Sequence, residues 1–254
     1  MALRRIFLFT DCVDVAANEL RISLVNALGD TSEAIVEPFV PISPAFSVIN
    51  TNFVVRLIAD SCPDGSVLMT TINAEKERPR NVIGRTQKKG LVFIGRDMGS
   101  FDWLTRDLGC AELYDLGRHN EGGFISFAGK YTTAPLAAKA ALGTPLSTLG
   151  QAIPSDSVHR LELPDGVIVH VDNFGMMKFT GTLEDQTDGA RYLVSINGHE
   201  IDAVFGRRLM SYETGQWVLF PGSSFNLFEL GKVREIGAPT LGARVGTLLS
   251  LRCK

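Results

Sequence analysis

The chain has 254 residues, of which 45% are hydrophobic and 21% are charged. This is ordinary globular composition, able to bury a substantial core in one large domain or two small ones. The net charge of −3 argues against a nucleic-acid partner, because binding to nucleic acid needs clustered cations.

The first part of the sequence alternates predicted strands and helices. In chain order these are strand 6–9, helix 15–28, strand 34–40, helix 43–58, strand 66–72, strand 91–95, helix 101–108, strand 111–116 and helix 133–142. The helix at 15–28 has Leu20, Leu24 and Leu28 at helical spacing, with Gly29 as a natural end. Such alternation predicts an α/β domain with a mostly parallel sheet.

Polar residues follow two of these strands. Asp11 comes after strand 6–9, and the charged segment 74–89 follows strand 66–72. Ligands of α/β proteins bind outside the carboxyl ends of the strands, so both places are candidates for a ligand site. The alternatives are a helix cap or turn for Asp11 and a solvated loop for 74–89.

From residue 158 onward the sequence contains only strand signals. The predicted strands are 158–163, 167–171, 177–180, 192–196, 201–205, 209–212, 217–220, 226–230 and 245–251. Short strands at this spacing predict a small antiparallel barrel or sandwich. Prolines at 145 and 154 punctuate the region before them. We therefore predict an α/β N-terminal domain at 1–148, a linker at 149–157 and an all-β, barrel-like C-terminal domain at 158–254.

No common cofactor or metal motif is present. The sequence has no GxGxxG, P-loop, HExxH or GxSxG pattern. The four cysteines are dispersed: Cys12, Cys62, Cys110 and Cys253. This dispersion predicts reduced thiols, a cytoplasmic location and no zinc site. The apolar run at 6–9 is too short for a signal peptide, and no stretch is long enough for a membrane span.

Six short motifs stand in order along nearly the whole chain. They are Thr10-Asp11, Ser66 to Asn73, Phe93-Ile-Gly-Arg-Asp-Met-Gly99, Phe127-Ala-Gly-Lys130 with Ala134-Pro-Leu-Ala-Ala138, His170-Val-Asp-Asn-Phe-Gly175 and Ser223 to Leu230. Together they resemble the S-adenosyl-L-methionine (SAM) hydroxide adenosyltransferase family, which also contains the fluorinase and chlorinase enzymes. The resemblance implies a homotrimer that binds SAM where one subunit's N-terminal domain meets a neighbour's barrel. Water or a halide then attacks the ribose C5′ and displaces methionine, with SAM as substrate and no cofactor.

The resemblance also implies roles for the binding residues. Asp11 accepts hydrogen bonds from the ribose hydroxyls, and Phe127 and Phe174 pack on the adenosine. Asp172 pairs with the methionine ammonium, and Ser224 holds its carboxylate. From the residues alone, Phe174 also fits a core position, Asp172-Asn173 a turn and Ser224 a loop.

The catalytic positions depart from the family pattern. In the family's hydrolases an Asp, an Arg and a His prepare the water. The Arg is retained as Arg80, but the Asp of the Asp-Pro-Gly loop is Asn73 and the His of Phe-His-Gly is Ala128. We expect Asn73 and Arg80 to be the catalytic residues, with Asp97 among the substrate-binding ones. Asparagine can orient water but cannot act as a carboxylate base.

Other polar groups of the family pattern are also replaced. The Asn expected to read the adenine edge is Met176, which has no donor but can pack on a ring. Three functions stay open. The first is a divergent SAM hydrolase giving adenosine and L-methionine. The second is a catalytically degenerate adenosine- or SAM-binding protein. The third is an altered substrate, with new polar groups from Lys130, Glu75 or His119.

Overall fold

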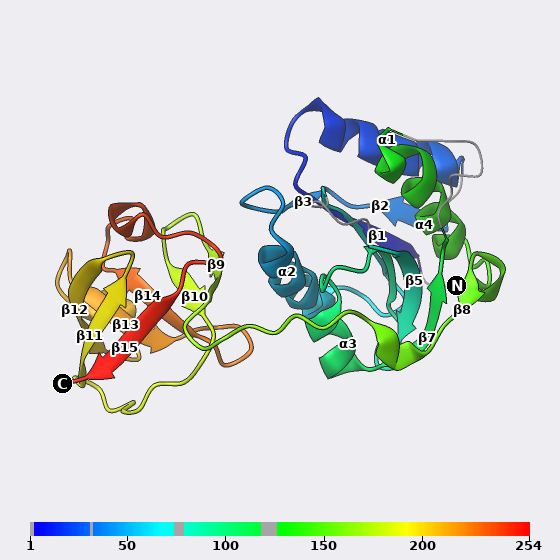
Figure 1. Cartoon of the computed structure of the whole chain (residues 1–254). Coiled ribbons are helices and arrows are strands. Elements are labelled where there is room, and N and C mark those ends of the chain that lie inside the picture. The colour runs from blue at the N-terminus through cyan, green and yellow to red at the C-terminus, as the bar shows by residue number, and fades with distance from the viewer. Residues whose placement is uncertain (1–2, 31–32, 74–78, 118–125) are drawn as a thin grey trace. The chain divides into compact units, whose positions relative to one another are not determined.

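The structure, a computed structural model, describes residues 3–30, 33–73, 79–117 and 126–254. The chain divides into two compact units, Met1–Leu161 and Glu162–Lys254 (Figure 1). Residues 149–157, predicted to be a linker, belong to the first unit, because Gln151–Ala152 form a strand of its sheet. The prolines that suggested a linker, Pro145 and Pro154, each precede a short 3₁₀ helix inside that unit.

The sheet of the first unit is mixed. In spatial order its strands are β2 (Ala34–Val36), β1 (Arg4–Thr10), β4 (Val67–Thr71), β6 (Val92–Arg96), β5 (Asn81–Thr86), β7 (Cys110–Asp115) and β8 (Gln151–Ala152), and β3 (Val40–Pro41) also pairs with β1. Pairing is parallel from β2 to β6 and for β3, and antiparallel from β6 through β5 and β7 to β8. The prediction of a mostly parallel sheet is therefore not confirmed.

Strand β5 lies inside the segment that we interpreted as a polar loop, so that interpretation is wrong for residues 81–86. Residues 74–78 of the segment, and the turn expected at 121–123, lie outside the described residues. Val82 and Ile83 are the only fully buried apolar side chains of this strand. The strand forms because β6 and β7 pair with it on both sides, and this pairing is not visible in the local sequence.

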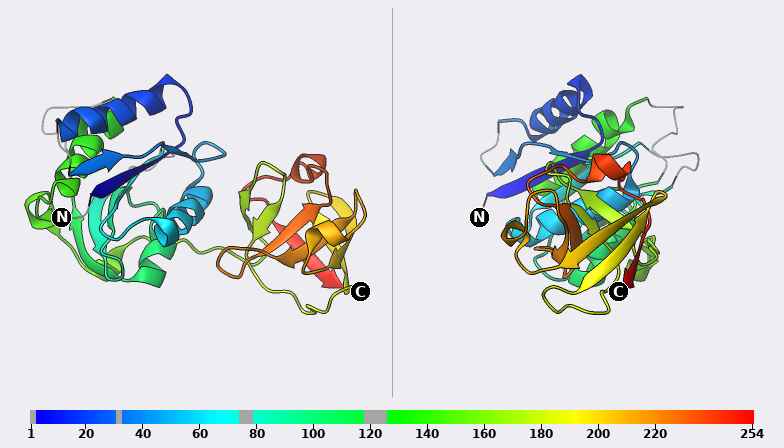
Figure 2. Two further views of the ribbon diagram at one scale, coloured as in Figure 1. Left: turned by 180° about the vertical axis from the view of Figure 1, so that it is seen from behind. Right: turned by 90° about the vertical axis from the view of Figure 1, so that its left-hand side faces the viewer.

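In the part of the chain that the structure describes, four α-helices cover the two faces of this sheet. They are α1 (Val15–Leu28), α2 (Val48–Ser61), α3 (Asp102–Leu108) and α4 (Ala134–Ala141), with a π-helical turn, η1 (Gly129–Thr133), before α4. Helices α1 and α4 lie on one face, and α2 and α3 on the other (Figures 1 and 2). Helix α2 begins later than predicted, because Phe46 has a left-handed φ of 66° and the Ser47 side chain caps the helix.

The core of the first unit aligns the carboxyl ends of two neighbouring strands. Ile6 and Leu8 of β1 and Met69 of β4 pack together with residues of α1 and α4. In the parallel register of the two strands, Thr10 lies opposite Thr71. Any residue that follows either strand therefore emerges at the same edge of the sheet, where α/β proteins bind ligands.

The second unit is a curled, barrel-like sheet. Its strands, in spatial order, are β15 (Leu249–Cys253), β11 (Arg191–Ile196), β12 (His199–Phe205), β13 (Trp217–Pro221), β14 (Phe228–Lys232), β10 (Met177–Phe179) and β9 (Ile168–Val171). Pairing is antiparallel except between β12 and β13. A bridge between Val167 and Leu248 joins the two edges of the sheet and curls it.

Two strands predicted for this part of the chain are not strands. Residues 158–163 pair with no strand, and Leu209–Ser211 form a 3₁₀ helix, η4. The other 3₁₀ helices are η2 (Leu146–Thr148), η3 (Ser155–Ser157) and η5 (Ala238–Leu241). Within the described residues, no helix combines the length and the apolar character that crossing a membrane requires.

Candidate functional site

Asp11, directly after β1, is a buried carboxylate at the carboxyl-end edge of the first sheet, where α/β proteins bind ligands. The residue is only 7% exposed. Its Oδ2 accepts hydrogen bonds from the backbone N–H groups of Phe46 at 3.0 Å and Asn73 at 3.2 Å. Its Oδ1 is shielded from solvent and has no hydrogen-bond partner among the described residues. Because buried polar atoms nearly always have partners, Oδ1 is an acceptor available to a donor from outside the described residues.

Phe46 is a residue of this site that sequence reasoning missed. Its N–H holds Asp11, and its side chain is 53% exposed. The signal was local: Ser47 accepts from the backbone N–H of Asn50, which is an N-cap pattern. Recognising Ser47 as the cap would have placed Phe46 outside the helix, in a loop next to the strand ends.

Asn73 is brought to Asp11, but through its backbone. The N–H of Asn73 donates to Asp11, and its side chain is exposed. Two residues considered as new polar groups, Glu75 and His119, lie outside the described residues. The third, Lys130, forms an ion pair with Glu19 at 2.7 Å.

Arg80 and Asp97 are brought to each other. Nε and Nη2 of Arg80 donate to Oδ2 of Asp97 at 3.0 and 2.8 Å. Arg80 also donates to the backbone carbonyl of Ser157, and Oδ1 of Asp97 accepts from the backbone N–H of His159 at 2.9 Å. The Asp97 side chain is 1% exposed. Asp97 therefore holds residues 157–159 against the rest of the first unit, directly through Oδ1 and through Arg80 at Oδ2.

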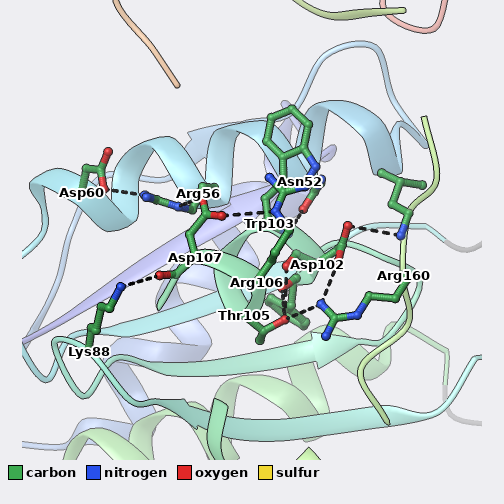
Figure 3. A network of polar contacts seen from close by, with 12 residues as sticks. Asn52, Arg56, Asp60, Lys88, Asp102, Trp103, Thr105, Arg106, Asp107 and Arg160 are labelled. Atoms are coloured by element: carbon green, nitrogen blue, oxygen red, sulfur yellow. Dashed lines mark hydrogen bonds and ion pairs between the residues drawn. The ribbon is translucent and has the colours of Figure 1, made fainter. Parts of the chain in front are cut away.

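A second buried aspartate holds the residues that follow. Asp102, at the start of α3, accepts from Arg160 Nη1 at 2.9 Å and from the backbone N–H of Leu161 at 3.3 Å (Figure 3). In the same network, Asn52 accepts from the backbone N–H of Trp103, and Arg56 donates to Asp107 (Figure 3). These contacts explain how 158–161 is held without belonging to a sheet: the side chains of Asp97 and Asp102, and not a neighbouring strand, accept from the N–H groups of His159 and Leu161.

Phe127 lies at the start of the π-helical turn on the α1 and α4 face. It has a left-handed φ of 60° and packs, half-buried, against the core of the first unit. Ala128 follows, and then Gly129 passes close to Thr71: a Cβ at Gly129 would lie 2.5 Å from Thr71 Cγ2. This turn therefore lies at the end of β4, close to the strand edge where Asp11 is held.

In the second unit, Asp172 and Phe174 share one tight turn. Asp172 Oδ1 accepts from the backbone N–H groups of Phe174 and Met176, both at 2.9 Å. This is a turn-forming aspartate, as one of the two interpretations predicted. Phe174 is 61% exposed, which excludes the core position considered for it. Met176 packs, half-buried, against a small apolar cluster with Leu209 and Val218.

Ser224 is buried in a tight turn between β13 and β14. The residue is 6% exposed, and its carbonyl accepts from the backbone N–H of Leu227 at 3.0 Å. The two central residues of the turn, Phe225 and Asn226, have left-handed φ angles of 55° and 56°. This geometry is that of a type I′ turn, which fixes the position of Ser224 relative to the two strands.

A buried ion pair below this turn was missed from the sequence. Lys178 of β10 binds Glu229 of β14, and their side chains are 11% and 6% exposed. Gly222 passes so close that a Cβ would lie 2.5 Å from Glu229 Oε1. His170 pairs with Lys178 in the sheet register, and burial, with the positive charge of Lys178 second, lowers its pKa below 6.5. Lys178 and Glu229 each stand between apolar residues of their strands, a pattern that is typical of solvent-facing positions.

Within ranges 3–30, 33–73, 79–117 and 126–254, no three His, Cys, Asp or Glu side chains are grouped as metal ligands. All four cysteines are free thiols.

Comparison with known proteins identifies relatives of both units. Residues 7–150, more than half of the chain, match the SAM hydroxide adenosyltransferase N-terminal domain. Two solved structures share the fold. An uncharacterized conserved protein from Thermotoga maritima is 17% identical with a TM-score of 0.79, over 97% of this chain and 100% of that one. A conserved hypothetical protein from Thermus thermophilus is 21% identical with a TM-score of 0.73, over 98% and 100%. A search of curated proteins found no match.

Proposed function

The chain belongs to the SAM hydroxide adenosyltransferase family, and from that membership we propose that it hydrolyses SAM to adenosine and L-methionine. The observation that carries the proposal is the Asp11 carboxylate, with Oδ2 fixed by two backbone N–H groups and Oδ1 buried without a partner among the described residues. The two hydroxyls of a ribose are donors that match such an acceptor, and hydrogen bonds to a charged acceptor are the strong ones.

The proposed reaction asks for little acid–base chemistry. Water attacks C5′, the C5′–S bond breaks with its electron pair going to sulfur, methionine leaves as a neutral thioether and one proton passes to solvent. Because the sulfonium is already an activated leaving group, the protein mainly has to hold a desolvated water in line with the breaking bond. Asn73 would orient the water, and Arg80, fixed by Asp97, would place positive charge near it.

The second unit would supply the methionine end of the site. The proposal assigns Asp172 to the ammonium and Ser224 to the carboxylate, with Phe127 and Phe174 packing on the adenosine. The exposed ring of Phe174 supports this, because an exposed aromatic side chain is available for stacking. We further propose a homotrimer in which a neighbouring subunit contributes these groups. Light scattering of the purified protein measures its mass and so tests the trimer. The free thiols support a cytoplasmic location.

A second candidate function, binding of an adenosine compound without turnover, has an observation in its favour. Ala128 has no functional side chain, Asn73 carries no base, and both oxygens of Asp97 are already bound to Arg80 and His159. The groups that would activate water are therefore weaker than those that would bind the nucleoside.

One experiment separates the two candidates. The purified protein is incubated with SAM, adenosine and methionine are followed by chromatography, and binding of SAM is measured by calorimetry. Equimolar release of both products supports the hydrolase. Binding without products supports the second candidate and overturns the first. Absence of both overturns the two together.

A further inference from the structure

The Thr71 hydroxyl oxygen is, beside Asp11 Oδ1, a second buried polar atom at this edge of the sheet that has no hydrogen-bond partner among the described residues. Thr71 is the last residue of β4, opposite Thr10 of β1. Its Oγ1 is shielded from solvent. The neighbouring Thr10 differs, because its Oγ1 accepts from the backbone N–H of Cys12 at 3.1 Å.

The Thr71 hydroxyl lies beside the position of the missing histidine. A Cβ at Gly129 would lie 3.2 Å from Thr71 Oγ1 and 2.5 Å from Cγ2, so this glycine lets the turn pass directly over the threonine. The residue before Gly129 is Ala128, which stands where the family motif has its histidine. On the other side, Asn73, two residues after Thr71, donates its backbone N–H to Asp11.

Folding alone does not explain a threonine here. In the family motif that the strand resembles, two valines precede the Asp-Pro-Gly loop, and Thr71-Ile72 stand in their places. Valine has the shape of threonine without the hydroxyl, and a buried hydroxyl with no partner costs free energy relative to the apolar side chain. A hydroxyl at this position is therefore favourable only if it binds a group other than the described residues, such as a water molecule held in the site.

We propose that the Thr71 hydroxyl positions the attacking water, in place of the imidazole that Ala128 lacks; this inference rests on the proposed hydrolase function. The hydroxyl accepts a hydrogen bond from the water, whose lone pair then points at C5′. The water oxygen bonds to C5′, the C5′–S electron pair leaves with sulfur, and the proton released from the new hydroxyl passes to bulk water. Thr71 itself neither gains nor loses a proton overall.

The test compares Thr71→Val with Thr71→Ser on the full chain, measuring adenosine release at saturating SAM, SAM affinity by calorimetry and Tm. Thr71→Val should lower kcat roughly tenfold or more, the loss expected for one positioned hydrogen bond. Its SAM affinity should stay within about twofold and its Tm should be equal or higher. Thr71→Ser should retain most of the activity. Thr86→Val is the matched control, because that hydroxyl donates to Lys88 at 2.6 Å and accepts from Leu91 at 2.9 Å. It should lower Tm and leave kcat unchanged.

Two kinds of result would overturn the assignment. A Thr71→Val protein that releases adenosine at the wild-type rate removes the role of Thr71 and leaves the hydrolase function standing. The same follows if Tm and affinity fall together, because the hydroxyl is then structural. Wild-type protein that binds SAM without releasing adenosine overturns the hydrolase function, and the role of Thr71 falls with it.

Discussion

Arg80 donates two hydrogen bonds to a single oxygen of Asp97, from Nε at 3.0 Å and from Nη2 at 2.8 Å. The other oxygen of Asp97 accepts from the backbone of His159 at 2.9 Å. Two residues expected to meet the substrate are thus bound to each other, and they fix the segment that leads out of the first unit. Asp97 is thereby a structural carboxylate that holds the guanidinium of Arg80 in one orientation.

Asp97→Ala should destabilise the first unit. The change leaves the Arg80 guanidinium without its carboxylate and the N–H of His159 without its acceptor. Because Arg80 is about one-third exposed (32%), water compensates part of the loss. We expect the free energy of unfolding to fall by about 2–3 kcal/mol. Urea unfolding of a Trp217→Phe background, in which only Trp103 of the first unit fluoresces, measures it.

Asp156→Ala is the control for that measurement. Asp156 is an exposed acid of the same region and has no ion pair among the described residues. Its removal should change the free energy of unfolding by no more than about 0.5 kcal/mol. Equal stability of the Asp97→Ala and Asp156→Ala proteins would contradict the structural role of Asp97.

Asp11→Asn should weaken ligand binding without unfolding the site. The amide oxygen of asparagine can still accept from Phe46 and Asn73, but an NH₂ donor replaces the Oδ1 acceptor. We expect SAM affinity to fall roughly 10- to 100-fold, the loss of a hydrogen bond to a charged group, with Tm little changed. Calorimetry with SAM measures it. Asp14→Asn, at the exposed cap of α1, should bind as wild type; weakened binding by both variants would show that the effect is not specific to Asp11.

Local signals predicted some elements well and could not predict others. Helix α1 was predicted with its observed bounds, because its apolar spacing and the glycine that ends it all lie within the segment. Strand β5 was missed because Val82 and Ile83, its buried apolar residues, are too few to form a strand pattern in a charged segment. The strand also depends on β6 and β7 for pairing. The sequence of segment 158–163 predicts a strand, but the N–H groups of His159 and Leu161 bond to Asp97 and Asp102 and not to another strand.

The site shows the same division. An acid at the end of a buried strand marked Asp11, and the burial of its carboxylate agrees with a position at the ligand-binding edge. Lys178 and Glu229 were not recognised, because they are 51 residues apart and each stands between apolar residues, a pattern typical of solvent-facing positions. Gly222 packs closely against Glu229, and no local sequence pattern records that packing.

Breaking the Lys178–Glu229 pair should destabilise the second unit strongly, whereas replacing both residues by apolar ones should destabilise it much less. Lys178→Met leaves a buried carboxylate without a cation, and Glu229→Leu leaves a buried ammonium without an anion. Each single variant should lose about 3–5 kcal/mol of unfolding free energy, and the double variant much less, because two apolar side chains pack without a charge. Urea unfolding followed by Trp217 in a Trp103→Phe background reports on this unit. A double variant as unstable as the sum of the singles would contradict this prediction.

Stability of the second unit should fall on acidification because of His170. Burial lowers the pKa of His170 below 6.5, with Lys178 adding to the shift while Asp172 and Glu229 oppose it. Below pH 6.5 the unfolded chain therefore binds more protons at this residue than the folded one does. The stability that neutral His170 contributes is complete above pH 6.5 and is lost as the pH falls towards the lowered pKa of His170. Urea midpoints between about pH 7 and about pH 5 should fall less in His170→Gln than in wild type. The exposed His199→Gln serves as control, and equal slopes in all three proteins would rule His170 out.

Restoring the family's polar groups should raise turnover. Asn73→Asp places a carboxylate beside Asp11, and Ala128→His places an imidazole next to Gly129, which packs on Thr71 at the same sheet edge. A positioned general base contributes roughly 10²–10⁴-fold, so the double variant should release adenosine at least about tenfold faster than wild type. The negative charge of Asp11 disfavours ionisation of a carboxylate introduced beside it, so Asn73→Asp alone should gain activity with rising pH. Initial rates at saturating SAM across pH, beside SAM affinity, measure this. Unchanged rates with intact binding would mean that the water is held elsewhere than between these two positions, and the assignment of Asn73 as a catalytic residue would then be lost.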